Sequence, residues 1–337
     1  MEVLEQVAPA RIRELLAQER PFWLALAAPH EEELREAGEL LGLHPLAVQD
    51  SFEMGQRPKL DDYPDSALLV FYGARPGTGD GGERLPRPVE VHFHLTPHAI
   101  ISIGGGELDA LDEARAHIAL EHVRTLEDAL FHGLDAVAAS FTGPLQELDD
   151  EIDEIEDVLL DDPRPDIRRQ LLDRKHAVTR LRQVVEPQRD VLAGHRDMLE
   201  RLPGFEDRES RNRLRDVYDR LALIDQQIET VRESLSNALD LYVSAVSNRL
   251  NEIMKVLTIV ATFFLPLTFL TGFFGQNFAW MVRRIGSAAA FWGLGFGLAL
   301  AIVVAMWIAL TRAGYLTLHL PGRARRGGRE PDRSAGS

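Results

Sequence analysis

Two kinds of hydrophobic spacing alternate along residues 1–124. Apolar positions recur at helical intervals in residues 9–20 and 31–42, whereas short apolar or alternating runs occupy residues 22–27, 66–72, 89–95 and 98–104. Runs of the second kind, bounded by Pro, Gly and Asp, are typical of strands. The segment GARPGTGDGGERLPRP, residues 73–88, is rich in Gly and Pro and is predicted to be a loop. The pattern predicts an α/β domain over residues 1–124.

The pattern changes to long helices after about Thr125. Three- and four-residue steps, the spacing of a coiled-coil seam, separate Leu145, Leu148, Ile152, Ile155 and Leu159. Residues 147–162 hold ten carboxylates and no basic residue, and an Arg-rich stretch follows the break DDPRPD. Opposite charges on successive helices favour an antiparallel hairpin. The segment LPGFED, residues 202–207, predicts a second break.

Residues 208–274 predict one very long helix, because they contain one proline, Pro266, and one glycine, Gly272. At ~1.5 Å per residue such a helix reaches on the order of 100 Å. Isolated helices gain little stability alone, so it needs lateral partners, and oligomerisation supplies them. We assign residues 125–252 to a stalk of long helices.

Two apolar runs close the chain, from Val256 to Phe274 and from Ala288 to Leu310. Each has about 20 residues, enough to cross a hydrocarbon core of roughly 30 Å. Two buried helices of a soluble protein are the alternative, but adjacent runs with basic outer flanks favour a membrane hairpin. The predicted parts are a first span over 253–275, a loop over 276–287, a second span over 288–311 and a basic tail over 312–337.

Charge predicts the orientation of this hairpin in a cell's inner membrane. Basic residues precede the first span and follow the second: Arg249, Lys255, Arg312, Arg323, Arg325, Arg326 and Arg329. Basic flanks stay cytoplasmic, and the N-terminus lacks the pattern of a secretory signal. Both termini are therefore expected in the cytoplasm and the loop outside, although Arg283 and Arg284 run against this rule.

Composition argues against several classes of function. The 337-residue chain has a net charge of −16 and no cysteine, so it can form neither disulfides nor thiolate metal sites. The acidic balance argues against a nucleic-acid partner. The chain shows no Ser/His/Asp or Cys/His set and no nucleotide motif, since GGGELD after residue 103 lacks the P-loop and Rossmann spacings. We expect neither an enzyme nor a bound cofactor.

One face of the first span carries small or weakly polar side chains. These residues, called the stripe below, are Asn251, Met254, Thr258, Ala261, Leu265, Thr268, Gly272 and Gly275. Steps of three and four residues place them on the same side of a helix. Two interpretations remain open: close contact between helices, to which the Gly293/Gly297 pair of the second span also points, or the lining of a water-filled path.

The segment Asn251–Phe278 resembles the first transmembrane helix and exit loop of the CorA family of divalent-cation transporters. YVSAVSNRLNEIMKVLTI, HPLAVQDSFE and QRPKLDDY are also typical of that family, as is the order of parts. The resemblance implies an α+β protein: an α/β cytoplasmic domain, coiled-coil stalk helices and a two-helix transmembrane hairpin, assembled as a funnel-shaped homopentamer. It implies a channel for hydrated Mg²⁺, with Co²⁺ and Ni²⁺ as further candidates, gated by intracellular metal.

The resemblance also implies roles for individual residues. Gly275, Gln276 and Asn277 match the outer selectivity mouth; Thr268 and Asn251 match polar rings; Met254 and Leu257 match a hydrophobic gate. A ring of neutral amides suits Mg²⁺, which sheds its water reluctantly. The chain departs from the family by having Gln276 where Met is usual, and by having no acid in the loop that follows Asn277, residues 278–290.

Two further groups of side chains have less definite roles. Asp216 matches a regulatory metal site of the family, and Asp219 shares its helix face; the alternative is a pair of exposed acids bridged to Arg215 and Arg220. His92 and His94 share one face of a strand near His98. A solvent-facing strand is favoured for these histidines over a Zn²⁺ site.

Two other functions are kept as alternatives. The first is a zinc transporter of the same fold, as in the ZntB-like branch, which the neutral-to-basic outer loop favours. The second belongs to another class: a membrane-anchored coiled-coil scaffold that conducts nothing and works through its acidic helices.

Overall fold

The computed structural model describes residues 1–78, 84–104, 108–120, 123, 125–194, 208–276, 279–280, 283, 286–313 and 315. It divides into two compact units, Met1–Ala245 and Val246–Ser337, and each is considered by itself. One helix, α9 (Arg208–Phe274), begins in the first unit and ends in the second. The prediction of a single long helix over residues 208–274 is confirmed, with Pro266 in its interior.

A six-stranded mixed sheet forms the centre of the first unit, with the order β1-β2-β6-β5-β4-β3. The β1/β2 and β2/β6 pairs are parallel and the other three pairs are antiparallel. The strands are β1 (Glu2–Leu4), β2 (Phe22–Leu26), β3 (Lys59–Tyr63), β4 (Ser66–Thr78), β5 (Arg84–Leu95) and β6 (Ala99–Gly104). All four predicted strands are confirmed, and β1 and β3 are additional.

The prediction of a loop over residues 73–88 is wrong, because β4 and β5 pair through most of this segment, from Gly73↔Val89 to Thr78↔Arg84. Pairing with β3 ends at Val70, and pairing with β6 ends at Val91. The Pro-rich ends of β4 and β5 therefore form a two-stranded ribbon. Proline is tolerated there because each strand has a neighbour on only one side.

Side chains cover the free edge of β4 next to this ribbon. The Tyr72 N–H donates a hydrogen bond to the buried Gln188, and the Ala74 N–H donates to Ser140 Oγ at 2.8 Å. An uncovered strand edge is a template for pairing with another chain. These two bonds protect the ribbon from such pairing.

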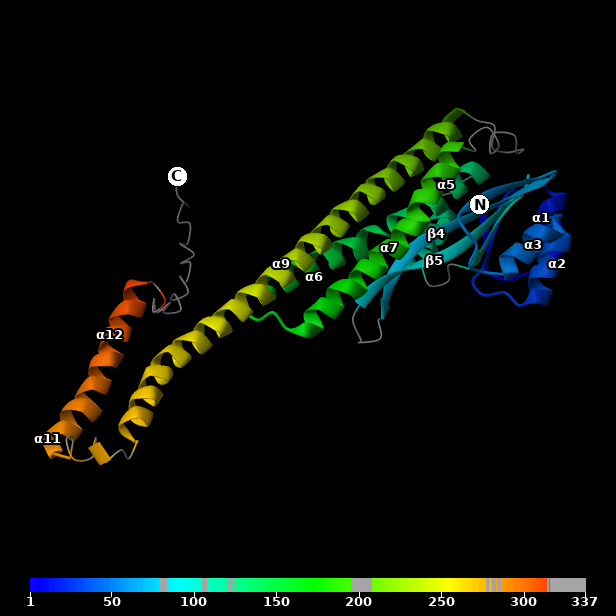
Figure 1. Cartoon of the computed structure of the whole chain (residues 1–337). Coiled ribbons are helices and arrows are strands. Elements are labelled where there is room, and N and C mark those ends of the chain that lie inside the picture. Colours follow the sequence, from blue (N-terminus) through cyan, green and yellow to red (C-terminus); the bar gives the residue numbers. More distant parts are fainter. Residues whose placement is uncertain are drawn as a thin grey trace, which may run out of the picture. The chain divides into compact units, whose positions relative to one another are not determined.

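Helices lie on both faces of the sheet (Figure 1). On one face are α1 (Pro9–Ala17), α2 (Glu31–Leu41) and α3 (Pro45–Phe52); on the other are α4 (Asp109–Leu120), α5 (Leu126–Ala139), α6 (Thr142–Asp161) and α7 (Pro165–Gly194). Phe22 and Leu24 face the first group, whereas the intervening Trp23 faces the second. The Trp23 indole N–H donates to Ser102 Oγ at 2.9 Å, which fixes the ring.

We expect Gly133→Ala to destabilise the first unit by about 1–3 kcal/mol, the usual cost of overpacking a core. A Cβ at Gly133 lies 2.6 Å from Trp23 Cη2 and 3.5 Å from a ring carbon of Phe93. The tethered indole has little freedom to move away. Thermal unfolding of the full-length protein measures the effect. Gly143→Ala is the matched control because its Cβ meets nothing within 4 Å; equal melting temperatures for the two variants contradict the packing argument.

The helical layer follows the predicted seam. Leu145, Leu148, Ile152 and Leu159 are buried and Ile155 packs against them. The predicted break is confirmed, since α6 ends at Asp161 and α7 begins at Pro165. The second predicted break, at residues 202–207, lies outside the described residues.

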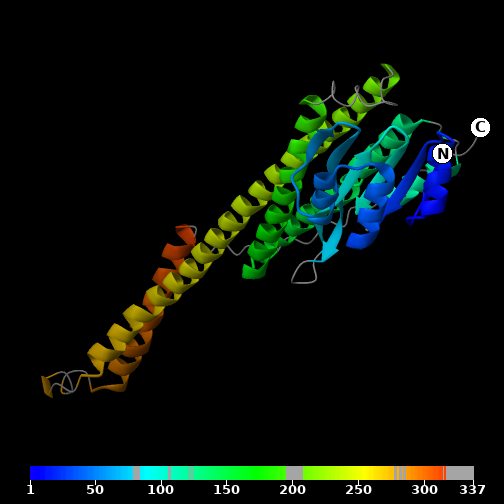
Figure 2. The ribbon, with the colours of Figure 1, turned by 90° about the vertical axis from the view of Figure 1, so that its right-hand side faces the viewer.

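Ion pairs join α7 to two different helices. Arg174 Nη2 lies 2.8 Å from Glu151 of α6, as the charge pattern predicts, but Arg189 Nη1 lies 2.6 Å from Asp225 of α9. The basic helix is therefore shared between α6 and α9. In both views α7 and the first part of α9 lie side by side (Figures 1 and 2).

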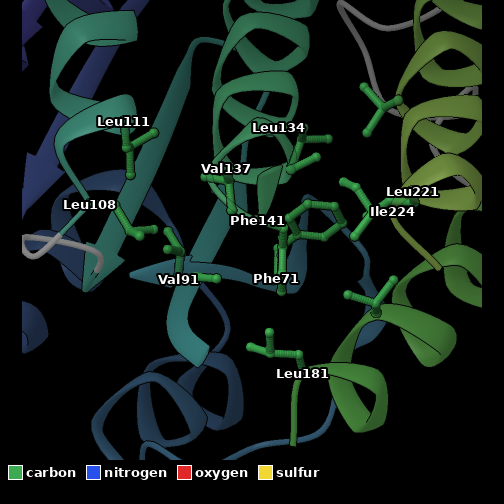
Figure 3. Close-up of a cluster of buried hydrophobic side chains, with 14 of the residues drawn as sticks. Phe71, Val91, Leu108, Leu111, Leu134, Val137, Phe141, Leu181, Leu221 and Ile224 are labelled. Carbon is green, nitrogen blue, oxygen red and sulfur yellow. The ribbon is translucent and has the colours of Figure 1, made fainter. Parts of the chain in front are cut away.

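Phe141 lies where the sheet meets the helices of the first unit. Its ring is fully buried among Phe71 of β4, Leu181 of α7, and Leu221 and Ile224 of α9 (Figure 3). One continuous hydrophobic core therefore connects the sheet to the part of α9 that belongs to this unit.

Candidate ion path and metal-binding residues

Two helices are long and apolar enough to cross a membrane: Asn212–Phe274 within α9, and Ala288–Arg312, which comprises α11 (Ala288–Ala290), η1 (Phe291–Gly297) and α12 (Leu298–Arg312). In their most apolar windows only 6% and 0% of the residues are buried. Helices in the core of a soluble protein bury such surfaces, so this exposure argues against the soluble alternative. Lipid or other copies of the chain can cover these exposed apolar surfaces.

All eight residues of the stripe are exposed in the single chain. The opposite side of α9 is more covered: Ile259, Phe263 and Pro266 are half-buried and Leu270 is buried. Leu257, the other predicted gate residue, lies next to the stripe and is also exposed. Bulky apolar residues outside the stripe, such as Phe264, are exposed as well. The surface left uncovered thus has a small, weakly polar part and a bulky apolar part.

The stripe threonines have their hydroxyl hydrogens engaged within the helix. Thr258 Oγ1 donates to the Met254 carbonyl at 2.7 Å, and Thr268 Oγ1 donates to the Phe264 carbonyl at 2.8 Å. Their oxygens are left to act as acceptors. Water molecules around a cation point their hydrogens outward, so an acceptor surface suits a hydrated cation and disfavours an anion.

The end of α9 requires a glycine at position 275. The Gly275 N–H donates to the Thr271 carbonyl at 2.8 Å, and a Cβ at Gly275 would lie 2.9 Å from that oxygen. The Gln276 N–H donates to the Phe273 carbonyl at 3.4 Å. Gly275 and Gln276 are both exposed. Asn277 lies outside the described residues.

Asp216 and Asp219 are exposed on α9, and within the part of the chain that the structure describes neither takes part in an ion pair. Arg220 instead donates to Asp135 of α5 at 2.5 Å. The two acids are exposed, as the alternative expects, but among the described residues neither is bridged to Arg215 or Arg220. Their charges remain available at the surface of the first unit.

The prediction that His92 and His94 face solvent is wrong, since both are fully buried beneath α3. Ser51 Oγ lies between them, 2.9 Å from His92 Nδ1 and 2.7 Å from His94 Nε2. His92 Nε2 is 2.7 Å from Glu90 Oε1, and that carboxylate also accepts the backbone N–H groups of Gly55 and Gln56. Spacing along the strand pointed to the two histidines but not to Glu90, and no local signal connects them with Ser51, some 40 residues away.

Hydrogen bonding and burial shift the pKa values of this network. Burial pushes the pKa of Glu90 up, but the hydrogen bonds from His92, Gly55 and Gln56 outweigh it and hold the pKa below its ordinary value. Burial, together with repulsion from His92, lowers the pKa of His94 to about 3. Among the described residues no group of three or more His, Asp or Glu has the arrangement of a metal site.

The segment Gln56–Tyr63, QRPKLDDY, holds the junction between α3 and β3. Lys59 Nζ lies 2.5 Å from Asp50 and 2.7 Å from Asp61, while the Tyr63 ring stacks on His44 with centroids 4.5 Å apart. The Gln56 carbonyl accepts a hydrogen bond from the Tyr72 hydroxyl at 2.5 Å. The structure thus gives this motif a role in folding.

These features define a membrane protein with two spans, a long continuous helix and a mixed-sheet domain. The chain belongs to the family of CorA-like Mg²⁺ transporters, because the sequence model described as "CorA-like Mg2+ transporter protein" matches residues 18–312. It is accordingly a divalent-cation transporter and not an enzyme.

Individual relatives differ in the ion for which they are named, and a solved structure matches the fold. The cobalt/magnesium transport protein CorA of Thermotoga maritima is 32% identical over 267 residues, which cover 77% of this chain and 74% of that protein. The zinc transport protein ZntB of Klebsiella pneumoniae is 28% identical over 297 residues, covering 87% and 86%. The complete structure of the CorA magnesium transporter from Methanocaldococcus jannaschii has a TM-score of 0.74 at 22% identity, covering 87% and 91%.

Proposed function

We propose that the protein conducts hydrated Mg²⁺ into the cytoplasm through a homopentamer whose first spans surround the path. The observation that carries this proposal is the stripe, because the single chain leaves uncovered a weakly polar face that ends at Gly275. Small and hydroxyl side chains along one face are typical of contacts between membrane helices, so this face suits an axis shared by copies of the chain. The proposal keeps the domain boundaries that the sequence predicts, with the two spans at residues 253–275 and 288–311.

The proposed mechanism begins at the outer mouth. Five copies of Asn277, each preceded by the Gln276 amide, accept hydrogen bonds from the water around an incoming ion without removing that water. Thr268 offers the next acceptor ring, Met254 and Leu257 form the apolar gate, and Asn251 receives the ion beyond it. The membrane potential contributes ~2.3 kcal/mol per charge per 100 mV, so a dication needs no ATP.

Orientation and regulation follow from charge. The basic residues around the two spans favour an inner-membrane protein with both termini in the cytoplasm. Asp216 and Asp219 are then carried on the cytoplasmic part of α9, where bound intracellular metal relieves repulsion between neighbouring copies and holds the gate closed.

Zinc is the second candidate ion. The similarity to ZntB and the absence of acids from the loop of residues 278–290 favour it. Metal-dependent dye uptake into proteoliposomes, run over a panel of divalent ions, distinguishes the candidates. Mg²⁺ flux supports the main proposal, flux of Zn²⁺ alone supports the second, and the absence of any flux supports a scaffold that does not conduct.

We expect Thr268→Val to lower Mg²⁺ flux by about fivefold, since it removes an acceptor worth about 1 kcal/mol while keeping the side chain's shape. Thr311→Val is the matched control, because Thr311 makes the same intrahelical bond, to the Trp307 carbonyl at 2.9 Å, in the other span. Flux assays on both variants check this. Equal losses in the two variants would show that the helix, and not the path, is affected.

A further inference from the structure

The four side chains Glu90, His92, Ser51 and His94 form a hydrogen-bonded chain inside the first unit. Both histidines are fully buried, Ser51 is 3% exposed, and the chain links α3 to β5. It has only one unpartnered ring nitrogen, His94 Nδ1, which is itself buried. The transport proposal uses none of these residues.

The direction of the hydrogen bonds follows from the donors available. His92 Nε2 faces a carboxylate, so it carries a hydrogen and donates to Glu90. With neutral His92, the Ser51 hydroxyl donates to His92 Nδ1. Ser51 has no second hydrogen, so His94 Nε2–H must donate to the Ser51 oxygen. His94 Nδ1 is then a bare acceptor, and every N–H and O–H in the chain has a partner.

A proton that enters at either histidine changes this arrangement in the same way. A proton on His92 turns Nδ1 into a donor, so Ser51 must donate to His94 Nε2 and the His94 hydrogen moves to Nδ1. A proton taken up directly by His94 also ends on Nδ1. In both cases a buried N–H donor is left without an acceptor, which is costly.

The groups that face this chain cannot offset that cost. β6 presents Ile101 and Ile103, and β4 presents Leu68, Val70 and Tyr72, whose hydroxyl donates elsewhere. The nearby charges of β3 and α3, Lys59, Asp61 and Asp50, are paired with one another. Glu90 already accepts three N–H groups and touches His92, not His94.

We propose that this chain is an acid-sensitive latch, closed while both histidines are neutral and opened by proton uptake, which releases α3 and residues 53–58 from the sheet. The Glu90 carboxylate holds residues 55 and 56 through their backbone N–H groups, so the turn after α3 moves with the latch. The inference concerns the first unit alone and does not depend on the ion transported.

The expected response has a definite sign. In the closed state burial keeps the pKa of His94 at about 3, whereas an open, hydrated histidine has a pKa of about 6.5. The open state therefore binds protons as pH falls below about 6.5, and stability of the closed state is lost toward acid. Between pH 7 and pH 5 the opening equilibrium is expected to rise by about 25-fold.

Hydrogen–deuterium exchange on the full-length protein in detergent tests this, with rates corrected for the intrinsic effect of pH on amide exchange. Protection of amides in residues 45–58 is expected to fall about 25-fold from pH 7 to pH 5. His94→Leu should remove this pH dependence, whereas the control His30→Leu, at an exposed histidine before α2, should retain it. The latch proposal is overturned if protection in the unmodified protein does not change with pH, or if His94→Leu shows the same pH dependence as the unmodified protein.

A second measurement covers the case in which His94→Leu fails to fold. Exchange of the imidazole C2 hydrogen in the unmodified protein reports the titration of each histidine. His94 should show no titration above pH 5. A midpoint near 6.5 for His94 contradicts the proposal.

Discussion

Replacing Asn277 by Ala is expected to lower divalent-cation uptake by at least about tenfold. In the proposed mechanism the Asn277 amides accept hydrogen bonds from the water around the incoming ion. The amide oxygen can accept two such bonds, each worth about 1 kcal/mol, and 1.4 kcal/mol corresponds to a factor of ten. Initial rates of Mg²⁺ uptake into proteoliposomes, at matched protein content, measure the change.

Asn237→Ala is the control for this experiment, because Asn237 is an exposed amide on α9 far along the chain from the mouth. It should transport as the unmodified protein does. Uptake by Asn277→Ala at the same rate as by Asn237→Ala removes Asn277 from the path. Asn277→Gln keeps an amide and should retain more flux than Asn277→Ala.

Phe141→Ala is expected to destabilise the first unit by about 3–5 kcal/mol, the range for emptying a phenylalanine site in a core. The fully buried ring joins β4, α7 and α9, so the cavity has well-packed walls on several sides (Figure 3). For a unit of this size the melting temperature should fall on the order of 10 °C. Circular dichroism of the full-length protein during heating measures it.

Phe52→Ala serves as the comparison for Phe141→Ala, since Phe52 is 52% exposed on α3. Its melting temperature should change by only a few degrees. A small shift for Phe141→Ala would mean that the helices adjust to fill the space, and that the sheet and α9 are less tightly joined than their packing indicates.

The sequence predicts α9 in full because a helix is limited mainly by breakers, and residues 208–274 hold only Pro266 and Gly272. The sequence also predicts the central strands, because strands buried in a sheet appear as short apolar runs. It fails at residues 73–88, where Gly and Pro suggested a loop. Pairing between β4 and β5 overrides that composition, because both strands continue past their other neighbours.

The candidate site is only partly accessible from the sequence. Helical periodicity is enough to place Thr268 and Leu265 on one face, and the structure leaves that face exposed. The role of Asn277 depends on resemblance alone and stays a prediction. The Ser51–His94 contact cannot be predicted locally, because folding brings together two residues 43 positions apart.

The central claim is that the stripe on α9 lines a water-filled path for cations. The chain has no cysteine, so single cysteines can be introduced without background reaction. Leu265 and Phe264 are neighbours with similar exposure in the single chain, 74% and 66%, but only Leu265 lies on the stripe. After treatment with a water-soluble thiol reagent, Leu265→Cys should lose Mg²⁺ flux while Phe264→Cys keeps it; equal loss, or no loss in either variant, contradicts the account.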